Sequence, residues 1–304
     1  MKKLSSSEIY EIGVWLFESM NNCRLCPMDC GVNRLDGELG CCHSTSQLRV
    51  ASHNLHFGEE PPLSGGGGSG TIFLSNCSLS CLYCQNYPIS QFGTGQDIST
   101  DQMAQMMLKL QKRGAENINF VTPSHMLPMI LIALAEAKKD GLLIPLVYNC
   151  SGYEKVEIIR HLDGIIDIFL PDMRYGDDAY ARKYSGCKNY VETNRAAIKE
   201  MYRQVGNLVC DKRGIAVSGM IVRHLVLPGR ISGSKEILKF LAEKISPDIY
   251  ISLMSQYFPA HLGMKDCLIN RRITNEEFDE VVEAFDEYGL KNGFTQQLDY
   301  EEVY

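Results

Sequence analysis

The pattern of hydrophobic and polar positions changes near residue 70 of the chain. Beyond it, short runs rich in β-branched and aromatic residues alternate with longer runs whose apolar positions repeat every three or four residues. Some short runs, such as IIDIFL at 165–170, are apolar throughout, which indicates strands buried on both faces. The strands that this pattern predicts are Thr71–Leu74, Ile118–Val121, Ile144–Tyr148, Ile165–Leu170, Ile215–Val226 and Ile249–Leu253.

Helical periodicity fills the intervals between these strands. One predicted helix has Ser99 or Thr100 as its N-cap and ends at Gly114. The pair Thr274 and Glu277 forms a capping box for a last helix that runs through Tyr288. The other predicted helices span residues 7–20, His125–Lys139, Glu154–His161, Thr193–Val205 and Lys235–Ile245.

Alternating strands and helices predict parallel strands joined by right-handed crossovers. Six such units in about 190 residues suit a partial (β/α)6 barrel better than a complete eightfold barrel, which typically takes about 250 residues. Residues 21–64 show neither period, so we expect them to be irregular. The sequence therefore predicts an α/β protein with a cysteine-rich, metal-binding extension at residues 1–64 and a partial barrel with a C-terminal helix at 65–304.

Composition and charge limit the partners of this protein. The chain is 45% hydrophobic and 22% charged, as soluble globular proteins are, and its net charge of −7 argues against binding to nucleic acid. No apolar run approaches the roughly 20 residues of a membrane span, and the first residues lack the apolar stretch of a signal peptide. We therefore expect a cytoplasmic protein without a membrane or nucleic-acid partner. A nucleobase remains open as a small substrate.

Twelve cysteines need an explanation in such a chain. The cytosol keeps thiols reduced, so clustered cysteines indicate metal ligands rather than disulfides. Seven of the twelve fall into two groups. We expect the scattered ones to be small buried hydrophobic residues, although Cys150, beside a predicted strand end, is also a candidate second catalytic thiol. The scattered cysteines are Cys41, Cys150, Cys187, Cys210 and Cys267.

The first group, Cys77, Cys81 and Cys84, directly follows the first predicted strand. Structural zinc and electron-transfer clusters normally take four protein ligands, so three thiolates describe an incomplete site. On a cubane cluster they leave one iron open, to which the amino and carboxylate groups of S-adenosylmethionine can bind. The alternative is a zinc knuckle completed from a distance, which a position after the first strand of a βα series disfavours.

The second group is Cys23, Cys26 and Cys30, followed by Cys41 and Cys42. Four ligands would close this site, so we expect a structural role. Zinc and an auxiliary iron–sulfur cluster both accept four thiolates, and we favour zinc. Reduced core cysteines are the weaker alternative, because the segment is too polar for a core.

Residues 59–91, EEPPLSGGGGSGTIFLSNCSLSCLYCQNYPISQ, closely resemble the radical S-adenosylmethionine superfamily, in particular its pyruvate formate-lyase-activase-like branch. The segments CRLCPMDCGVNRLDGELGCC, LPDMRY and VRHLVLPG also match, so the resemblance covers about residues 20–260. It implies a [4Fe-4S] cluster on Cys77, Cys81 and Cys84, and reductive cleavage of S-adenosylmethionine to a 5′-deoxyadenosyl radical that abstracts hydrogen from a substrate. The branch places its fourth N-terminal cysteine where Cys42 stands.

The resemblance also implies roles for polar residues at the carboxyl ends of the strands. Tyr83 would lie against the adenine, and Arg223 would pair with the methionine carboxylate through a bidentate fork. Where related activases carry a Gly-Gly-Glu segment for the cofactor's amino group, this chain departs with Thr122-Pro123-Ser124. The expected cofactor-binding residues are Tyr83, Thr122, Ser124, Asn149, Ser151, Asp172, Arg223 and Gln256.

Three functions follow from these features. The first is a radical enzyme acting on a small molecule; the branch includes queuine lyase, which releases a 7-deazapurine precursor from queuine, and Asp172, Asp177 or Asp178 could pair with a purine-like N–H edge. The second is an activase that acts on a glycine of a protein. The third is a non-catalytic iron–sulfur redox sensor. A radical enzyme would also need a reducing partner such as flavodoxin or ferredoxin.

Overall fold

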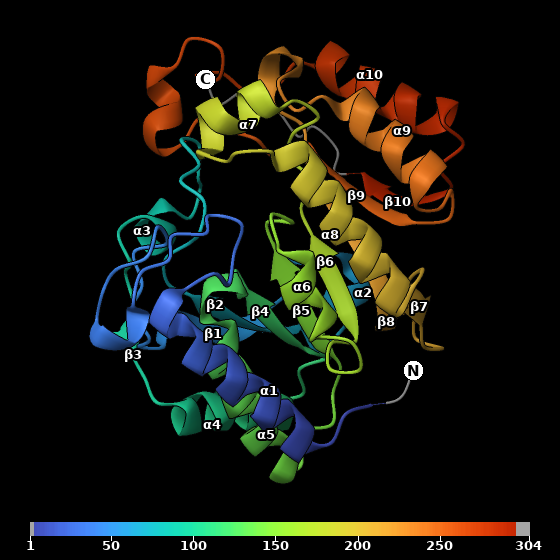
Figure 1. The fold of residues 1–304 in the computed structure, drawn as a ribbon. Coiled ribbons are helices and arrows are strands. Elements are labelled where there is room, and N and C mark those ends of the chain that lie inside the picture. The colour runs from blue at the N-terminus through green and yellow to red at the C-terminus, as the bar shows by residue number, and fades with distance from the viewer. Residues whose placement is uncertain (1–2, 296–304) are drawn as a thin grey trace, which may run out of the picture.

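A mostly parallel sheet, curved and open, organises the chain in the computed structural model, which describes residues 3–295 (Figure 1). Its strands lie in the order β10-β9-β8-β6-β5-β4-β2-β1-β3, and the short β7 pairs with β8. The strands are β1 (Arg49–His56), β2 (Ser69–Leu74), β3 (Gln96–Asp97), β4 (Ile118–Val121), β5 (Leu146–Cys150), β6 (Ile168–Pro171), β7 (Val209–Cys210), β8 (Ala216–Leu225), β9 (Tyr250–Met254) and β10 (Asn292–Thr295).

The six predicted strands are confirmed as β2, β4, β5, β6, β8 and β9, which pair with one another in parallel. The strand β4 has the predicted bounds, and the others are displaced at one or both ends. A seventh parallel strand, β10, was not predicted, because it is short and mostly exposed. The predicted class, an α/β protein with a partial barrel, is therefore confirmed.

The prediction that residues 21–64 are irregular is wrong. The strand β1 lies in this segment and pairs antiparallel with β2, and β3 pairs with β1 in turn. Only two residues of β1 are exposed, Ser52 and Asn54, and most of the others are polar or only partly buried, so the strand has little apolar signal of its own. The division of the chain between residues 64 and 65 stays a prediction.

The helices follow the strands as crossovers. The predicted capping box of Thr274 and Glu277 starts α10, and of the two predicted N-caps of α4 the structure has Ser99, which also forms a capping box with Gln102. The helix α7 was not predicted, and α6 is shorter than expected. The helices are α1 (Ser6–Glu18), α2 (Pro61–Ser64), α3 (Tyr87–Ser90), α4 (Thr100–Lys112), α5 (Leu127–Lys139), α6 (Val156–Arg160), α7 (Asp178–Ser185), α8 (Tyr190–Val205), α9 (Ser234–Lys244) and α10 (Asn275–Glu287).

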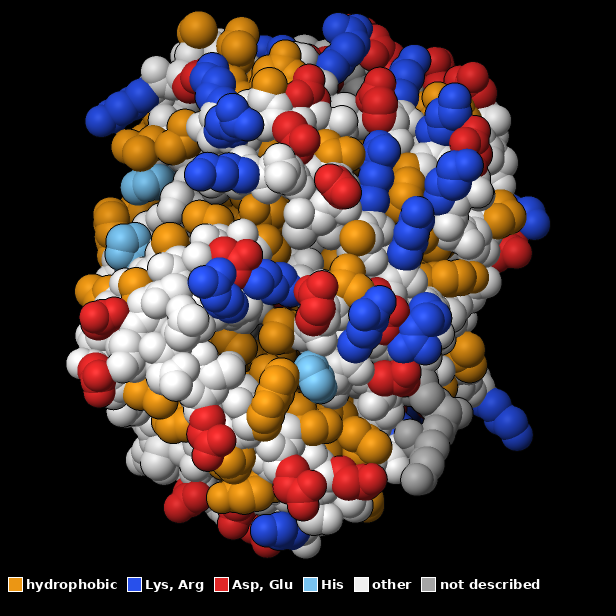
Figure 2. Space-filling model, in the orientation of Figure 1, with side chains coloured by type: hydrophobic (Ala, Val, Ile, Leu, Met, Phe, Trp, Pro, Cys, Tyr) orange, Lys and Arg blue, Asp and Glu red, His pale blue; other side chains and the backbone are white. Residues whose placement is uncertain are grey.

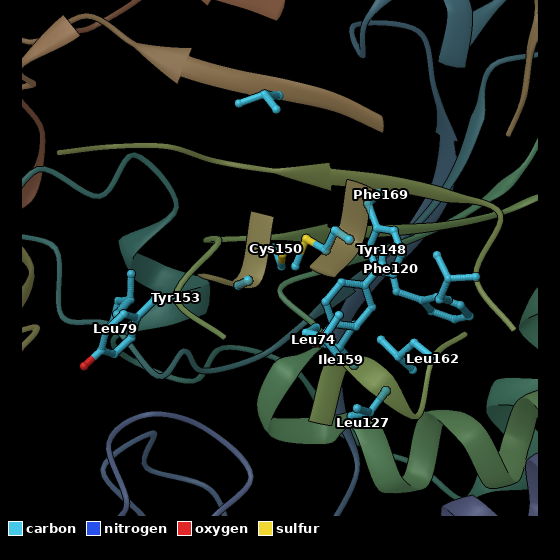
Figure 3. Close-up of a cluster of buried hydrophobic side chains, with 14 of the residues drawn as sticks. Leu74, Leu79, Phe120, Leu127, Tyr148, Cys150, Tyr153, Ile159, Leu162 and Phe169 are labelled. Atoms are coloured by element: carbon cyan, nitrogen blue, oxygen red, sulfur yellow. The ribbon is translucent and has the colours of Figure 1, made fainter. Parts of the chain in front are cut away.

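The two faces of the sheet carry different cores. Alternate strand residues such as Phe120, Tyr148 and Phe169 pack against the helices on the outer face, where α1 and α5 lie side by side (Figures 1 and 3). The opposite residues line the inner face. There, Leu63 of α2 packs with Val147, Ile168, Leu170, Ala216 and Ile221.

The surface carries both signs of charge. Figure 2 shows acidic and basic side chains interspersed over the face that it draws. Within residues 3–295, no helix combines the length and the apolar character that crossing a membrane requires.

Candidate functional site

The loop after β2 carries Cys77, Cys81 and Cys84 and is fixed by backbone hydrogen bonds to two distant segments. The N–H groups of Ser80 and Leu82 donate to the carbonyls of Ser185 (3.2 Å) and Tyr184 (2.8 Å) at the end of α7. The N–H group of Gly263 donates to the Leu82 carbonyl at 2.7 Å. These bonds set the path of the loop around the three thiols.

Each of the three sulfurs lies within hydrogen-bonding distance of a protein donor. Arg174 and Ser185 both reach Cys81, so a positive charge and a hydroxyl face the same sulfur. Such contacts stabilise a thiolate and tune the potential of an iron–sulfur cluster, so the surroundings of the three cysteines fit the expected [4Fe-4S] cluster. The contacts to sulfur are Leu79 N to Cys77 (3.4 Å), Arg174 Nη1 to Cys81 (3.3 Å), Ser185 Oγ to Cys81 (3.0 Å) and Ser90 Oγ to Cys84 (3.1 Å).

Burial penalises these thiols in their charged form. It raises the pKa of Cys77 to about 12, and it also raises the pKa of Cys81 despite the nearby Arg174 guanidinium. Positively charged iron would offset that penalty. Among residues 3–295, no three His, Cys, Asp or Glu side chains are close enough together to hold a single metal ion. A cubane makes a different demand, because each thiolate binds a different iron.

A pocket of about 160 Å³ opens beside Cys84, between the cysteine loop and the carboxyl ends of β6, β8 and β9. Four of the eight expected cofactor-binding residues line it, namely Tyr83, Asp172, Arg223 and Gln256. The Tyr83 ring packs edge-on against Tyr257, with ring centroids 5.7 Å apart, so it forms a wall of this pocket. Larger hollows of the described surface lie around α7, α9 and α10 and beside the N-terminal segment, and none of the three thiols lines them.

Asp172 and Arg223 belong to one charge network. The Asp172 carboxylate accepts from Arg174 Nη2 at 2.6 Å and from Arg223 Nε at 2.8 Å, while Arg223 Nη2 donates to Asn149 Oδ1 at 2.6 Å. Burial would raise the pKa of Asp172, but the two guanidinium groups outweigh it and hold the pKa below its usual value. The Arg174 Nε atom is buried without a hydrogen-bond partner among the described residues, so this network can still donate to a ligand.

Three other expected residues point away from this pocket. Ser124 donates to Glu154, and Ser151 Oγ accepts from Tyr153 N at 3.4 Å. Thr122 has a φ of 61° at the end of β4, and its N–H group donates to the Asn149 carbonyl at 2.9 Å. None of the three lines the pocket beside Cys84. Their expected contacts with the cofactor stay predictions.

The structure places Cys150 in the outer hydrophobic core rather than in the pocket (Figure 3). It follows Asn149 on β5, so the two side chains face opposite sides of the sheet. Burial raises the pKa of Cys150 well above its usual value. These surroundings match a buried structural thiol and do not support a second catalytic thiol.

Two charged residues of this region were missed in the sequence analysis. Arg174 contacts both Cys81 and Asp172, and its signal was present in LPDMRY, two residues after Asp172. Glu59 lies 3.8 Å from Arg223 although 164 residues separate them in the chain. No local pattern could have paired them, because the contact depends on how β1 joins the sheet.

The N-terminal cysteines gather around Gly40 and Arg34. A Cβ atom on Gly40 would lie 3.3 Å from Cys42 Sγ and 3.5 Å from Cys30 Sγ. Arg34 Nη1 points to Cys23 Sγ at 3.8 Å, so the guanidinium lies beside the group. Cys42 is buried and its neighbour Cys41 is exposed.

Comparison with known proteins defines the class. The model of the radical SAM superfamily matches residues 71–222, half of the chain. An uncharacterized protein of Methanocaldococcus jannaschii is 30% identical over 282 residues, which cover 88% of this chain and 75% of that protein. The pyruvate formate-lyase-activating enzyme of Clostridium pasteurianum is 24% identical over 200 residues, or 63% of this chain and 75% of that enzyme.

Two solved structures share the fold. The FeFe-hydrogenase maturase HydG of Carboxydothermus hydrogenoformans superposes with a TM-score of 0.51 at 11% identity, over 74% of this chain and 52% of that one. Streptococcus suis SuiB gives 0.50 at 10% identity, over 73% and 47%. The matched part is thus about half of each of those chains. With the family match and the thiol loop, these findings show that the chain belongs to the radical SAM superfamily, whose members use a [4Fe-4S] cluster and S-adenosylmethionine.

Proposed function

We propose that this radical SAM enzyme abstracts hydrogen from a small-molecule substrate and is a lyase, with queuine as the most concrete candidate substrate. The observation that carries the proposal is the single pocket that joins Cys84 to Asp172, Arg174 and Arg223. Its wall carries Asp172, Arg174 and Arg223, and such a charged wall suits small polar molecules.

The residues of the pocket have distinct tasks in this proposal. Cys77, Cys81 and Cys84 hold the cluster, which together with S-adenosylmethionine supplies the 5′-deoxyadenosyl radical. Arg174 Nε, which has no hydrogen-bond partner among the described residues, would bind the carboxylate of the cofactor together with Arg223. The other contacts of the two guanidinium groups go to Cys81, Asp172, Asn149 and, from Arg223 Nη1 at 3.8 Å, to Glu59. Tyr83 offers its ring to the adenine, and Gln256 reaches the pocket from the end of β9.

Similarity to the Clostridium pasteurianum enzyme favours a second candidate, an activase that forms a radical on a protein glycine. Such an enzyme must admit a peptide loop to the radical. A redox sensor without catalysis is the third candidate, but it gives no reason for the two arginines that line the pocket.

The remaining features of the proposal concern partners and the second metal. A cytoplasmic flavodoxin or ferredoxin would supply the electron, and neither a membrane nor a nucleic acid takes part. Cys23, Cys26, Cys30 and Cys42 would bind a structural zinc ion, with an auxiliary cluster as the alternative. The choice of Cys42 over Cys41 is supported by its burial and by its closeness to Cys23 and Cys26, although the side chain of Cys41 interacts with Cys30.

The test is anaerobic turnover. The cluster is reconstituted and reduced with dithionite, S-adenosylmethionine is added, and 5′-deoxyadenosine is measured with and without queuine. A queuine-dependent increase with a new deazapurine product is expected. Cleavage that queuine leaves unchanged would contradict the lyase and direct the search to a glycyl-radical protein. No cleavage by the fully reconstituted protein would favour the redox sensor.

A further inference from the structure

The segment between β1 and β2 enters the partial barrel from its amino-terminal end. Because β1 runs antiparallel to β2, with His56 opposite Ser69, this segment begins at the amino ends of the parallel strands. Its helix α2 places Leu63 in the inner core, where the Leu63 carbonyl accepts from Asn117 Nδ2 at 2.8 Å. Leu63 therefore fills the interior of the partial barrel at the amino-terminal end of its strands. Glu59 and Glu60, directly before α2, lie next to it in the chain.

Glu59 lies between His56 and Arg223. Its side chain is 8% exposed, with Oε1 3.7 Å from His56 Nδ1 and Oε2 3.8 Å from Arg223 Nη1. Both distances exceed those of hydrogen bonds. Burial raises the pKa of Glu59 to about 7, against the attraction of Arg223. The Glu59 carboxylate therefore lies near the Arg223 guanidinium, and its oxygens can still accept hydrogen bonds from a ligand.

Two further acceptors of the interior have no partner. Glu60 is 7% exposed, and among the described residues its Oε2 atom has no hydrogen bond. The same holds for Oδ1 of the fully buried Asn119, which shares the inner face of β4 with Asn117. Buried acceptors without donors are costly, and a ligand that brings N–H groups would remove that cost.

The carboxylates expected from the sequence are committed elsewhere. Asp172 accepts from Arg174 and Arg223. Asp177 caps α7 by accepting from Ala179 N at 2.7 Å, and Asp178 accepts from Val191 N at 2.9 Å. The expectation that one of these three pairs with a substrate N–H edge is therefore not supported by their contacts.

We propose that Glu59 and Glu60 form the acceptor side of the substrate site and bind the N–H edge of a nitrogen heterocycle. The inference rests on the proposed function, since it names the substrate chemistry of the same interior. A carboxylate accepts two parallel N–H bonds, such as those of a ring N–H and the exocyclic amino group of a guanine-like ring. Arg223 links this site to the pocket beside Cys84, because it lines that pocket and its Nη1 atom lies 3.8 Å from Glu59 Oε2.

Equilibrium dialysis of the reconstituted protein tests this site with queuine, guanine and hypoxanthine, the last of which lacks the exocyclic amino group. We expect the wild-type protein to bind queuine and guanine at least tenfold more tightly than hypoxanthine. Glu59→Gln and Glu60→Gln should each weaken the binding of queuine and guanine about tenfold, since an amide offers one acceptor where the carboxylate offers two. Glu116→Gln is the matched control, at a partly buried glutamate that already accepts from Arg213 and Gly67 N, and it should leave the Kd unchanged.

Iron content and Tm show whether each variant keeps its fold, and the guanine–hypoxanthine comparison needs no variant. Wild-type protein that binds neither queuine nor guanine would overturn the inference, as would unchanged affinity in both glutamate variants. Loss of queuine affinity in the variants, with no queuine-dependent 5′-deoxyadenosine from the wild type, would leave this site standing and reject the proposed lyase.

Discussion

At the scale of single residues, a chain of hydrogen bonds ends on the sulfur of Cys81. Tyr83 and Tyr175 hydroxyls lie 2.6 Å apart, Tyr175 and Ser185 hydroxyls 2.7 Å, and Ser185 Oγ lies 3.0 Å from Cys81 Sγ. Burial raises the pKa of both tyrosines, so both hydroxyls keep their protons. The tyrosines can then donate along the chain, which leaves the Ser185 hydrogen for the thiolate.

We expect Ser185→Ala to lower the reduction potential of the reconstituted cluster. A hydrogen bond to the ligand sulfur stabilises the more negative, reduced state. The loss of about 1 kcal/mol corresponds to a shift of up to roughly 40 mV for a one-electron couple. An EPR-monitored redox titration measures this shift. Ser80→Ala, an exposed serine in the same loop, is the control, and equal potentials in the two variants would contradict the role of Ser185.

Glu154 gives the protein a pH dependence that can be tested. Burial raises its pKa to about 7, against hydrogen bonds from Ser124 and Tyr148. Between the usual glutamate pKa of 4.5 and about 7, the folded protein therefore holds a proton that the unfolded chain releases, so stability falls as the pH rises through this window. Above pH 7, the charged Glu154 carboxylate lowers the free energy of unfolding by up to about 3 kcal/mol.

Glu154→Gln removes this titration. We expect the Tm of the variant, relative to wild type, to rise by several degrees between pH 5 and pH 8, measured by differential scanning calorimetry. Glu157→Gln changes an exposed residue of α6 and should show no such trend. A constant difference between Glu154→Gln and wild type at all pH values would mean that Glu154 titrates normally.

At the scale of elements, the short helix α2 holds the interior of the partial barrel together. Leu63 is fully buried among inner-face residues of β5, β6 and β8. Leu63→Ala should therefore leave a cavity and lower the free energy of unfolding by about 2–5 kcal/mol. Urea denaturation measures the loss. Leu143→Ala, at a side chain that is 88% exposed, should change it by less than about 0.5 kcal/mol, and similar values for both variants would reject this role of α2.

The elements that the sequence analysis predicted carry a local sequence pattern, whereas those it missed depend on contacts with distant parts of the chain. The buried parallel strands and the capped helices carry local signals, namely apolar runs and residues such as Ser99 and Thr274. The strand β1 has no such signal, since its place depends on pairing with β2. Glu59 was missed for the same reason. The orientation of Cys150, in contrast, follows from the alternation along β5 once Asn149 is assigned to the inner face.

At the scale of the whole molecule, the order of the strands brings residues far apart in sequence to one pocket. Tyr83 follows β2, Asp172 follows β6, Arg223 lies on β8 and Gln256 follows β9. The sequence predicted their convergence because parallel strands present their carboxyl ends at one edge. It could not predict that Asp172 would be shared by two arginines, since that depends on side-chain geometry across the barrel.

The second metal site of the molecule can be argued from the charge of Arg34. This guanidinium is 1% exposed, donates twice to the Thr45 carbonyl and points to Cys23, and among the described residues it forms no ion pair with an Asp or Glu. A buried cation without a counter-charge is costly. Four thiolates around a divalent metal carry a net negative charge, which would supply the missing partner.

Metal analysis of variants tests that argument. With Cys77, Cys81 and Cys84 replaced by serine, the protein should still retain about one zinc ion per chain, because the N-terminal thiolates form a separate closed site. Adding Cys42→Ser should release the zinc, whereas adding Cys41→Ser should not, since Cys42 is buried beside Cys23 and Cys26 and Cys41 is exposed. Iron in place of zinc would identify an auxiliary cluster. Equal metal content in the two added variants would remove the reason to choose Cys42, and an apo triple variant would leave the charge of Arg34 to be balanced in some other way.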